Sequence, residues 1–306
     1  MTVRKGMARI PAGSFAMGSL EFFPEERPVR EVAVDSFWMD VHPVTTAAFG
    51  RFVRDTGYVT VAERELDPAE FPGADPADLV PGALVFEMTA GPVRLDDWRQ
   101  WWSYVPGACW RHPGGPGTNL VGRDRHPVTH IAYADAEAYA AWAGKELPSE
   151  AQWEFAARGG LAGARFPWGD EFAPRGRRRA NTWMGRFPWE FLPGKGQATR
   201  PGTTKVGTYP PNGYGLFDVA GNVWEWTTDY FHSEHRTGTA GSCCPAVYTA
   251  APPPAATGER YARRVIKGGS YLCAPNYCLR YRPAARQGQT EDTATCHLGF
   301  RCILPI

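Results

Sequence analysis

The hexapeptide Gly221-Asn-Val-Trp-Glu-Trp226 sets two tryptophans on either side of a carboxylate, directly after a glycine that permits a tight backbone turn. Asp218 lies just before that glycine. Two carboxylates and the carbonyls of such a turn can surround a hard cation such as calcium, although ordinary surface carboxylates fit the spacing equally well. Trp224 is a candidate lining residue of a pocket, and the simpler interpretation is a core aromatic.

Upstream of this segment, three stretches have the features of short helices. Residues 45–57 place apolar side chains on one face, between a threonine that can cap the helix and a glycine that can end it. Residues 134–144 repeat this pattern. Ser149 and Gln152 have the spacing of a capping box. The sequence therefore predicts three short amphipathic helices, the last two of which form a tight pair.

Strand patterns are weaker. Residues 29–38 and 128–132 alternate like strands, but most of the remaining chain is rich in glycine, proline and tryptophan and has no period. Irregular backbone has to find partners for its N–H and C=O groups in side chains, water or ions. We therefore expect little regular structure, supported in part by bound metal ions, and surface insertions at residues 66–81 and 238–257.

Length and charge narrow the classes of function. The chain has 306 residues, 43% of them hydrophobic, so its core needs no covalent staples. A net charge of +1 provides no long-range field, so neither nucleic acid nor a membrane is predicted as a partner. The N-terminus is charged where a secretory leader would be apolar, and no window is apolar enough to span a membrane. We expect a cytoplasmic protein.

The cysteines do not favour a disulfide scaffold, because their number is odd and cytosolic thiols are kept reduced. They are Cys109, Cys243, Cys244, Cys273, Cys278, Cys296 and Cys302. Between Cys273 and Cys278 lies a Pro-Asn pair that suits a loop folding back on itself, and the arginines that follow favour thiolates. The spacing fits a redox or soft-metal dithiol, a structural disulfide, or two unrelated buried thiols.

Two thiolates without a nearby histidine would be a poor tetrahedral zinc site but would suit Cu(I), which prefers few, soft ligands. Other chemistries lack support in the sequence. The glycine-rich loops that bind nucleotides, the His-Glu-x-x-His metalloprotease motif and the Gly-x-Ser-x-Gly nucleophile motif are all absent.

Taken together, these segments resemble the formylglycine-generating enzymes, also called sulfatase-modifying factors. The likeness runs from Ile10-Pro-Ala-Gly-Ser-Phe-Ala-Met-Gly18 through Gly221-Asn-Val-Trp-Glu-Trp226 to Leu298-Gly-Phe-Arg-Cys302. The motif of the catalytic members, Gly268-Gly-Ser-x-x-Cys273-x4-Cys278-x-Arg-Tyr-Arg282, is complete. The resemblance implies a single domain over residues 1–306, with an α+β fold of low regular secondary structure related to C-type lectins.

The resemblance implies oxidation of the cysteine in a Cys-x-Pro-x-Arg motif of an unfolded or nascent sulfatase to Cα-formylglycine, with molecular oxygen as the oxidant. Cys273 and Cys278 are implied as the catalytic residues and Cu(I) ligands, and the substrate thiolate would join them as a third sulfur. Cys278 would also form a disulfide with the substrate. Ser270, Trp224 and Tyr277 are implied to line the substrate pocket.

The same resemblance implies two structural calcium sites. The first comprises the side chains of Asp218 and Glu225 and the carbonyls of Gly221 and Val223. The second would use Asn181 and the carbonyl of Thr182. No Asp or Glu occurs from residue 191 to residue 217, where a carboxylate ligand is expected, and calcium held without a carboxylate binds weakly. The occupancy of the second site is therefore left open.

Two departures from the secreted animal relatives matter. This chain has Ala140, Ala157 and Pro283 in place of disulfide cysteines, which fits a cytoplasmic protein and leaves Cys302 without its mate. In addition, Cys296-His297 replaces a segment that helps to bind the motif arginine in those relatives. No arginine pocket is therefore predicted.

Two other functions remain open from the sequence. A noncatalytic, calcium-stabilised peptide-binding or lectin-like module would use the same scaffold without redox chemistry. A non-haem iron sulfoxide synthase would share the domain, but its iron-binding His-x3-His-x-Glu motif is absent from this chain.

Overall fold

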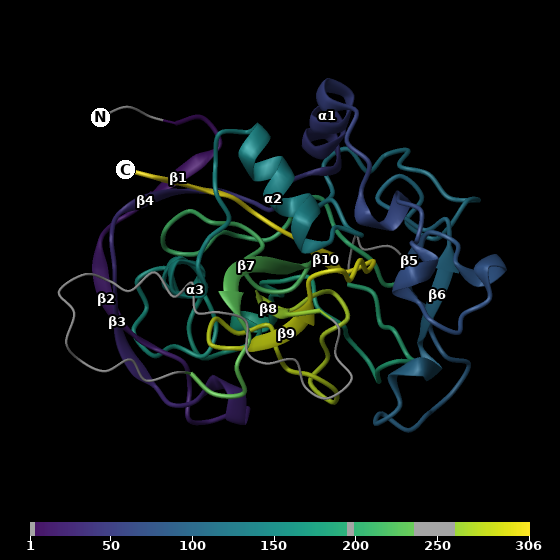
Figure 1. Cartoon of the computed structure of the whole chain (residues 1–306). Helices are drawn as coiled ribbons and strands as arrows, with labels where there is room; N and C mark the ends of the chain where they lie inside the picture. The colour runs from purple at the N-terminus through teal and green to yellow at the C-terminus, as the bar shows by residue number, and fades with distance from the viewer. Residues whose placement is uncertain (1–3, 195–198, 236–260) are drawn as a thin grey trace.

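The computed structural model describes residues 4–194, 199–235 and 261–306 (Figure 1). Its described α-helices are α1 (Thr46–Thr56), α2 (Tyr133–Trp142) and α3 (Glu150–Arg158). Thr45 caps α1 by accepting a hydrogen bond from the backbone of Ala48, and the two reciprocal bonds of the predicted capping box form at the start of α3. All three predicted helices are confirmed.

The strands in the described residues are short and form several small sheets. Their bounds are β1 (Met7–Ile10), β2 (Gly13–Met17), β3 (Arg30–Val34), β4 (Phe37–Asp40), β5 (Gly82–Phe86), β6 (Trp102–Pro106), β7 (Trp224–Tyr230), β8 (Arg263–Lys267), β9 (Arg286–Thr290), β10 (Leu298–Gly299) and β11 (Ile303–Pro305). The largest described sheet has the order β10-β7-β8-β9. The sheet β1-β4-β11 brings the first and last strands together (Figure 1).

One predicted strand is wrong. Residues 29–38 contain β3 and the first half of β4, with a break at residues 35 and 36, but residues 128–132 are not a strand. His130 has a φ of 59°, a left-handed conformation that breaks the extended course of the chain. The backbone N–H groups of Val128 and His130 donate instead to the carbonyls of Val44 and Thr295, each at 2.9 Å. The alternation of residues 128–132 therefore reflects their burial and not hydrogen-bonded pairing with a neighbouring strand.

The long irregular segments agree with the predicted α+β fold of low regular structure. Most of residues 66–81 is exposed, as predicted for a surface insertion, whereas residues 238–257 lie outside the described part of the chain. Within the described residues, no helix combines the length and apolar character that crossing a membrane requires.

A buried ionic contact joins distant parts of the chain next to the largest sheet. Glu225 of β7 is fully buried, and its two carboxylate oxygens accept hydrogen bonds from Arg301 at 2.7 and 2.8 Å. The indole N–H of Trp153, on α3, donates to the same carboxylate at 2.7 Å. Helix α3, strand β7 and the C-terminal segment are therefore held at one point.

Removing this contact should destabilise the protein strongly. Arg301→Met leaves the charge of Glu225 buried without its partner, which we expect to lower the free energy of unfolding by about 3–5 kcal/mol. Trp153→Phe removes one hydrogen bond to the same carboxylate, with an expected loss of about 1.5–3 kcal/mol. Urea unfolding followed by circular dichroism measures both changes.

Arg94→Met is the control, because the Arg94 side chain is 83% exposed and its ion pair with Asp96 is open to solvent. It should not change stability measurably. An Arg301→Met variant as stable as Arg94→Met would contradict the central role of the buried contact.

Candidate active site

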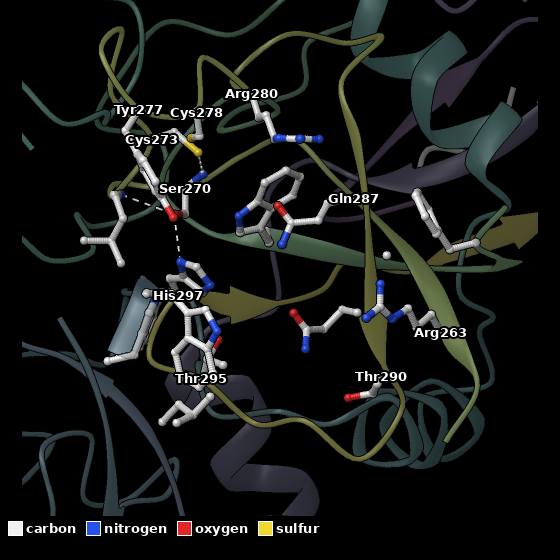
Figure 2. A pocket seen from close by; sticks show the side chains of 18 of the residues that line it. Arg263, Ser270, Cys273, Tyr277, Cys278, Arg280, Gln287, Thr290, Thr295 and His297 are labelled. Atoms are coloured by element: carbon white, nitrogen blue, oxygen red, sulfur yellow. Dashed lines mark hydrogen bonds between the residues drawn. The ribbon is translucent and has the colours of Figure 1, made fainter. Parts of the chain in front are cut away.

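A cavity of about 690 Å³ lies beside the sheet β10-β7-β8-β9 and is bordered by residues of β5 and β6 (Figure 2). Five residues implied by the sequence resemblance line it: Cys273, Cys278, Ser270, Trp224 and Tyr277. They come from the start of β7 and from the loop that follows β8. The structure therefore brings all the predicted catalytic and substrate-binding side chains to one cavity.

Local backbone contacts explain why the two cysteines meet. Cys273 N donates to the carbonyl of Ser270, which closes a turn directly after β8. The N–H groups of Tyr277, Cys278 and Leu279 then all lie 3.1 Å from the single carbonyl of Ala274. The loop folds back, as the Pro-Asn pair predicted, and carries Cys278 to Cys273.

The two thiols share their protons unequally. Burial opposes ionisation of Cys273, but hydrogen bonds from the Cys278 thiol and from the Ser270 N–H, together with the charge of Arg280, outweigh it and lower the Cys273 pKa below its ordinary value. Burial and the neighbouring Cys273 raise the pKa of Cys278 well above its ordinary value. The environment therefore favours the thiolate of Cys273 over that of Cys278, and the Cys278 thiol donates a hydrogen bond to Cys273.

Aromatic side chains form one wall of the cavity. Tyr277 stacks on Phe187 with the ring centroids 4.4 Å apart and contacts the edge of Trp101. Burial, reinforced by the two cysteines, raises the pKa of Tyr277 to about 12, so its phenol keeps its proton and remains a hydrogen-bond donor. Trp224 is 2% exposed and also lines the cavity, so it is at once a core and a pocket residue.

His297 is a site residue to which the sequence assigned no role. Its Nδ1 lies 3.1 Å from the Ser270 hydroxyl (Figure 2). Its ring packs edge-on against Trp102. Burial and nearby His130 lower the pKa of His297 to about 3, so the imidazole is neutral at physiological pH. Because Leu272 N also donates to the Ser270 hydroxyl oxygen, the imidazole fixes the direction of this hydroxyl.

The residues predicted for the first calcium site lie in one turn and the start of β7. Asp218 and Gly221 both have positive φ angles, of 55° and 71°. Burial raises the pKa of Asp218 to about 6, although Gly207 N donates to it at 2.8 Å. Glu225 is already paired with Arg301. Val223, which lies between Gly221 and Glu225 in the sequence, is buried. Asp218 is thus the carboxylate of this set whose charge remains least compensated.

The residues predicted for the second site contact the first. Asn181 forms an isolated bridge with Gly221, and its side-chain amide donates to the Asn222 side chain at 3.1 Å and to the Gly202 carbonyl at 2.9 Å. Thr182 is buried beside it. Among the described residues, no group of three or more His, Cys, Asp or Glu side chains is arranged to hold a metal ion. A cation at the second site would therefore depend on backbone and amide oxygens.

The whole chain matches a known family model. The sulfatase-modifying factor enzyme 1-like domain matches residues 2–306. The chain belongs to this family. A family relative from Mycobacterium tuberculosis, named formylglycine-generating enzyme, is 54% identical over 297 residues, which are 96% of each chain. Another relative of that name, from Thermomonospora curvata, is 45% identical over 98% of this chain and 93% of its own.

A solved structure shows the same fold at lower similarity. PvdO from Pseudomonas aeruginosa superposes with a TM-score of 0.59 and 24% sequence identity, over 98% of this chain and 94% of that one. This likeness concerns the fold alone. The family and the fold class predicted from the sequence are both confirmed.

In this sulfatase-modifying factor domain, His297 should make stability depend on pH. Its pKa falls from 6.5 in the unfolded chain to about 3 in the folded protein, so the unfolded chain binds the proton that the folded ring excludes. The free energy of unfolding should therefore decrease as pH is lowered below 6.5. His297→Asn keeps an amide near Ser270 but does not titrate, and should reduce this slope.

Urea unfolding of both proteins at a series of pH values measures the difference. Some slope should remain in the variant, because burial also lowers the pKa of His130 to about 4. Identical slopes in the two proteins would contradict the neutral, buried state of His297.

Proposed function

We propose that this protein oxidises the cysteine of a Cys-x-Pro-x-Arg motif in an unfolded or nascent sulfatase to Cα-formylglycine, with Cu(I) as cofactor and molecular oxygen as electron acceptor. The observation that carries the proposal is the pair Cys273 and Cys278, which lines the cavity with one sulfur biased toward thiolate. The names of the relatives support the conversion of cysteine to formylglycine.

The chemistry of the donor set supports copper. Cys273 and Cys278 are both free thiols, and soft thiolates with few further ligands suit Cu(I) better than zinc. No third His, Cys, Asp or Glu of the described residues completes a metal site with them, which leaves a position for the substrate thiolate. Since the pair retains protons, copper binding must release at least the proton of Cys278.

Bound Cu(I) would supply the one-electron steps that triplet oxygen requires. The residues of the chain do the rest. The pKa of Cys273 is lowered, in part by the charge of Arg280, which favours its thiolate as a ligand. Ser270 and Tyr277 offer hydroxyl groups to the substrate backbone or to oxygen. Trp224 and the stacked Tyr277 and Phe187 rings keep one side of the cavity apolar.

The electron balance requires a reductant. The substrate carbon loses two electrons as one C–H bond and the C–S bond are replaced by C=O, and the sulfur leaves as hydrogen sulfide. Reduction of molecular oxygen to water takes four electrons, so a thiol reductant must supply the remaining two. An assay should therefore contain Cu(I), air, a Cys-x-Pro-x-Arg peptide and a thiol.

Each cysteine of the pair should be essential. We expect Cys273→Ser and Cys278→Ser to abolish Cu(I) binding and formation of the aldehyde, while the far-UV circular dichroism spectrum stays unchanged. Cys109→Ser is the matched control, because Cys109 is a buried free thiol outside the cavity. Aminooxy capture of the peptide aldehyde and the mass of the peptide measure turnover.

The outcomes separate this proposal from its rival. Normal turnover in either variant would contradict the assignment of Cys273 and Cys278 as the catalytic residues. A parent protein that binds the peptide but leaves it chemically unchanged would instead support a noncatalytic peptide-binding module.

We also propose a structural calcium ion at Asp218, Glu225 and the carbonyls of Gly221 and Val223. A second ion at Asn181 and Thr182 would have no carboxylate ligand and is not part of this proposal. Support comes from Asp218, which is 7% exposed and whose pKa burial raises to about 6, so that a neighbouring cation would compensate its charge. Further support comes from the left-handed backbone of Asp218 and Gly221, because turns of this kind can leave carbonyl oxygens free to bind a hard cation.

Removal of calcium should lower stability. We expect EDTA to reduce the Tm of the parent protein by several degrees, and added calcium to restore it, because the ion binds only the folded chain. Asp218→Asn should respond less to EDTA, whereas Asp55→Asn, at an exposed position of α1, should respond like the parent. Differential scanning fluorimetry measures the shifts, and an unchanged Tm in EDTA would remove the calcium proposal.

A cytoplasmic setting completes the proposal. It is supported by the described cysteines, Cys109, Cys273, Cys278, Cys296 and Cys302, each of which is a free thiol. Cys243 and Cys244 lie outside the described residues.

A further inference from the structure

The cavity that contains the cysteine pair runs along the edge of a strand. Residues 287–290 of β9 are consecutive, and all of them line the cavity. Successive side chains of a strand point to opposite faces of the sheet, so a cavity bordered by all of these residues reaches the edge of the strand. The same cavity also covers part of one face, because Trp224 of β7 and Arg263 of β8 line it. Strand β9 is the last in the order β10-β7-β8-β9, so this edge carries no further strand among the described residues.

The register shows which backbone groups point into the cavity. β8 and β9 are antiparallel, and Glu291 N donates to the carbonyl of Ala262 at the end of their ladder. In an antiparallel pair, residues that bond to the partner alternate with residues whose N–H and C=O face away from it. Counted from Glu291, the outward residues of β9 include Gly288 and Thr290.

Two side contacts agree with this assignment. The carbonyl of Arg286, the preceding outward residue, accepts a hydrogen bond from the Arg280 guanidinium, and the carbonyl of Thr290 accepts one from Thr293 N. Neither carbonyl is therefore occupied by β8. Outside the strand ladders, the N–H and C=O of Gly288 and the N–H of Thr290 make no backbone hydrogen bond among the described residues, and the alternation of the antiparallel ladder directs them away from β8.

The absence of a side chain at Gly288 makes room for the ring of Phe231 on one face of β9. A Cβ atom placed on Gly288 would lie 2.5 Å from the ring of Phe231, so the ring packs directly on the backbone. Phe231 also lines the cavity. A residue paired with Gly288 on a neighbouring strand would place its own side chain over this ring, which is a favourable cross-strand contact.

We propose that the substrate polypeptide binds as an added strand along the outer edge of β9, with its backbone paired to Gly288 and Thr290 and its cysteine at the Cys273–Cys278 end of the cavity. This inference rests on the proposed function. Backbone pairing recognises an extended chain largely independently of its side chains, which suits a motif with variable positions. The motif proline fits such a strand only if its nitrogen, which carries no proton, faces away from β9.

A scan of backbone N-methylation in the substrate tests the proposal. Peptides that carry Cys-x-Pro-x-Arg with the cysteine replaced by serine are N-methylated at one non-proline residue at a time, and their Kd is measured by fluorescence polarisation. N-methylation at alternate residues on one side of the serine should weaken binding about tenfold, because each loses an inter-strand hydrogen bond. The residues between them should change binding less than about threefold.

A matched pair of variants tests the protein side. Thr290→Pro removes an outward N–H while leaving the ladder to β8 intact, and Thr290→Ala keeps the N–H but removes the hydroxyl that contacts Thr293. We expect the Pro variant to bind the peptide about tenfold more weakly than the Ala variant. Circular dichroism verifies that both are folded, and the peptide scan decides the question if the Pro variant is not.

The outcomes distinguish this inference from the proposed function. A flat N-methylation profile, or no binding of the unmethylated peptide, would overturn the added-strand inference. An alternating binding profile combined with failure of the cysteine-containing peptide to become an aldehyde would uphold the added strand and overturn only the oxidation.

Discussion

One buried carboxylate fixes the geometry on which the site depends. Glu225 receives hydrogen bonds from Arg301 near the C-terminus and from Trp153 on α3, so three distant segments meet at the start of β7. A charge buried in the interior is tolerated only when its partners are held in place. Trp224, the residue before Glu225, therefore enters the cavity from a point that the chain cannot easily move.

The cysteine loop depends on a different kind of constraint. Its turns are local, with three N–H groups gathered on the carbonyl of Ala274, and Gly269 allows the strand end to pass close to the backbone of Arg280. Such a loop brings two sulfurs together before any metal binds. For the proposed Cu(I) ion, the preorganised pair would lower the entropic cost of binding, and the lowered pKa of Cys273 would favour the thiolate that binds it.

The elements that the sequence predicts correctly are those that depend on contacts between nearby residues. The cap at Thr45, the capping box at Ser149 and the fold-back between Cys273 and Cys278 each involve contacts over a few positions. The strand predicted for residues 128–132 is wrong because the left-handed conformation of His130 is supported by a hydrogen bond to Thr295, far along the chain.

The role of His297 depends on tertiary structure in the same way. Strand β10 is parallel to β7, and only this pairing brings His297 to Ser270. The position of His297 directly before the Leu298-Gly-Phe-Arg-Cys302 segment is the sequence signal that could have identified it as a site residue. Its residue type alone does not predict the contact with Ser270. The open edge of β9 is likewise a matter of strand register, which local patterns do not specify.

The sheet β1-β4-β11 has a consequence for engineering. Since β1 and β11 pair with the two edges of β4, these strands lie about two strand spacings apart across the sheet, roughly 10 Å. Both run antiparallel to β4, so the start of β1 and the end of β11 lie at opposite ends of the sheet. A linker that spans the length of this sheet would join the two ends of the chain, and the exposed segment 66–81 offers a place for new termini. A circularly permuted protein of this kind would keep β7, the cysteine loop and β9 within one uninterrupted stretch of polypeptide.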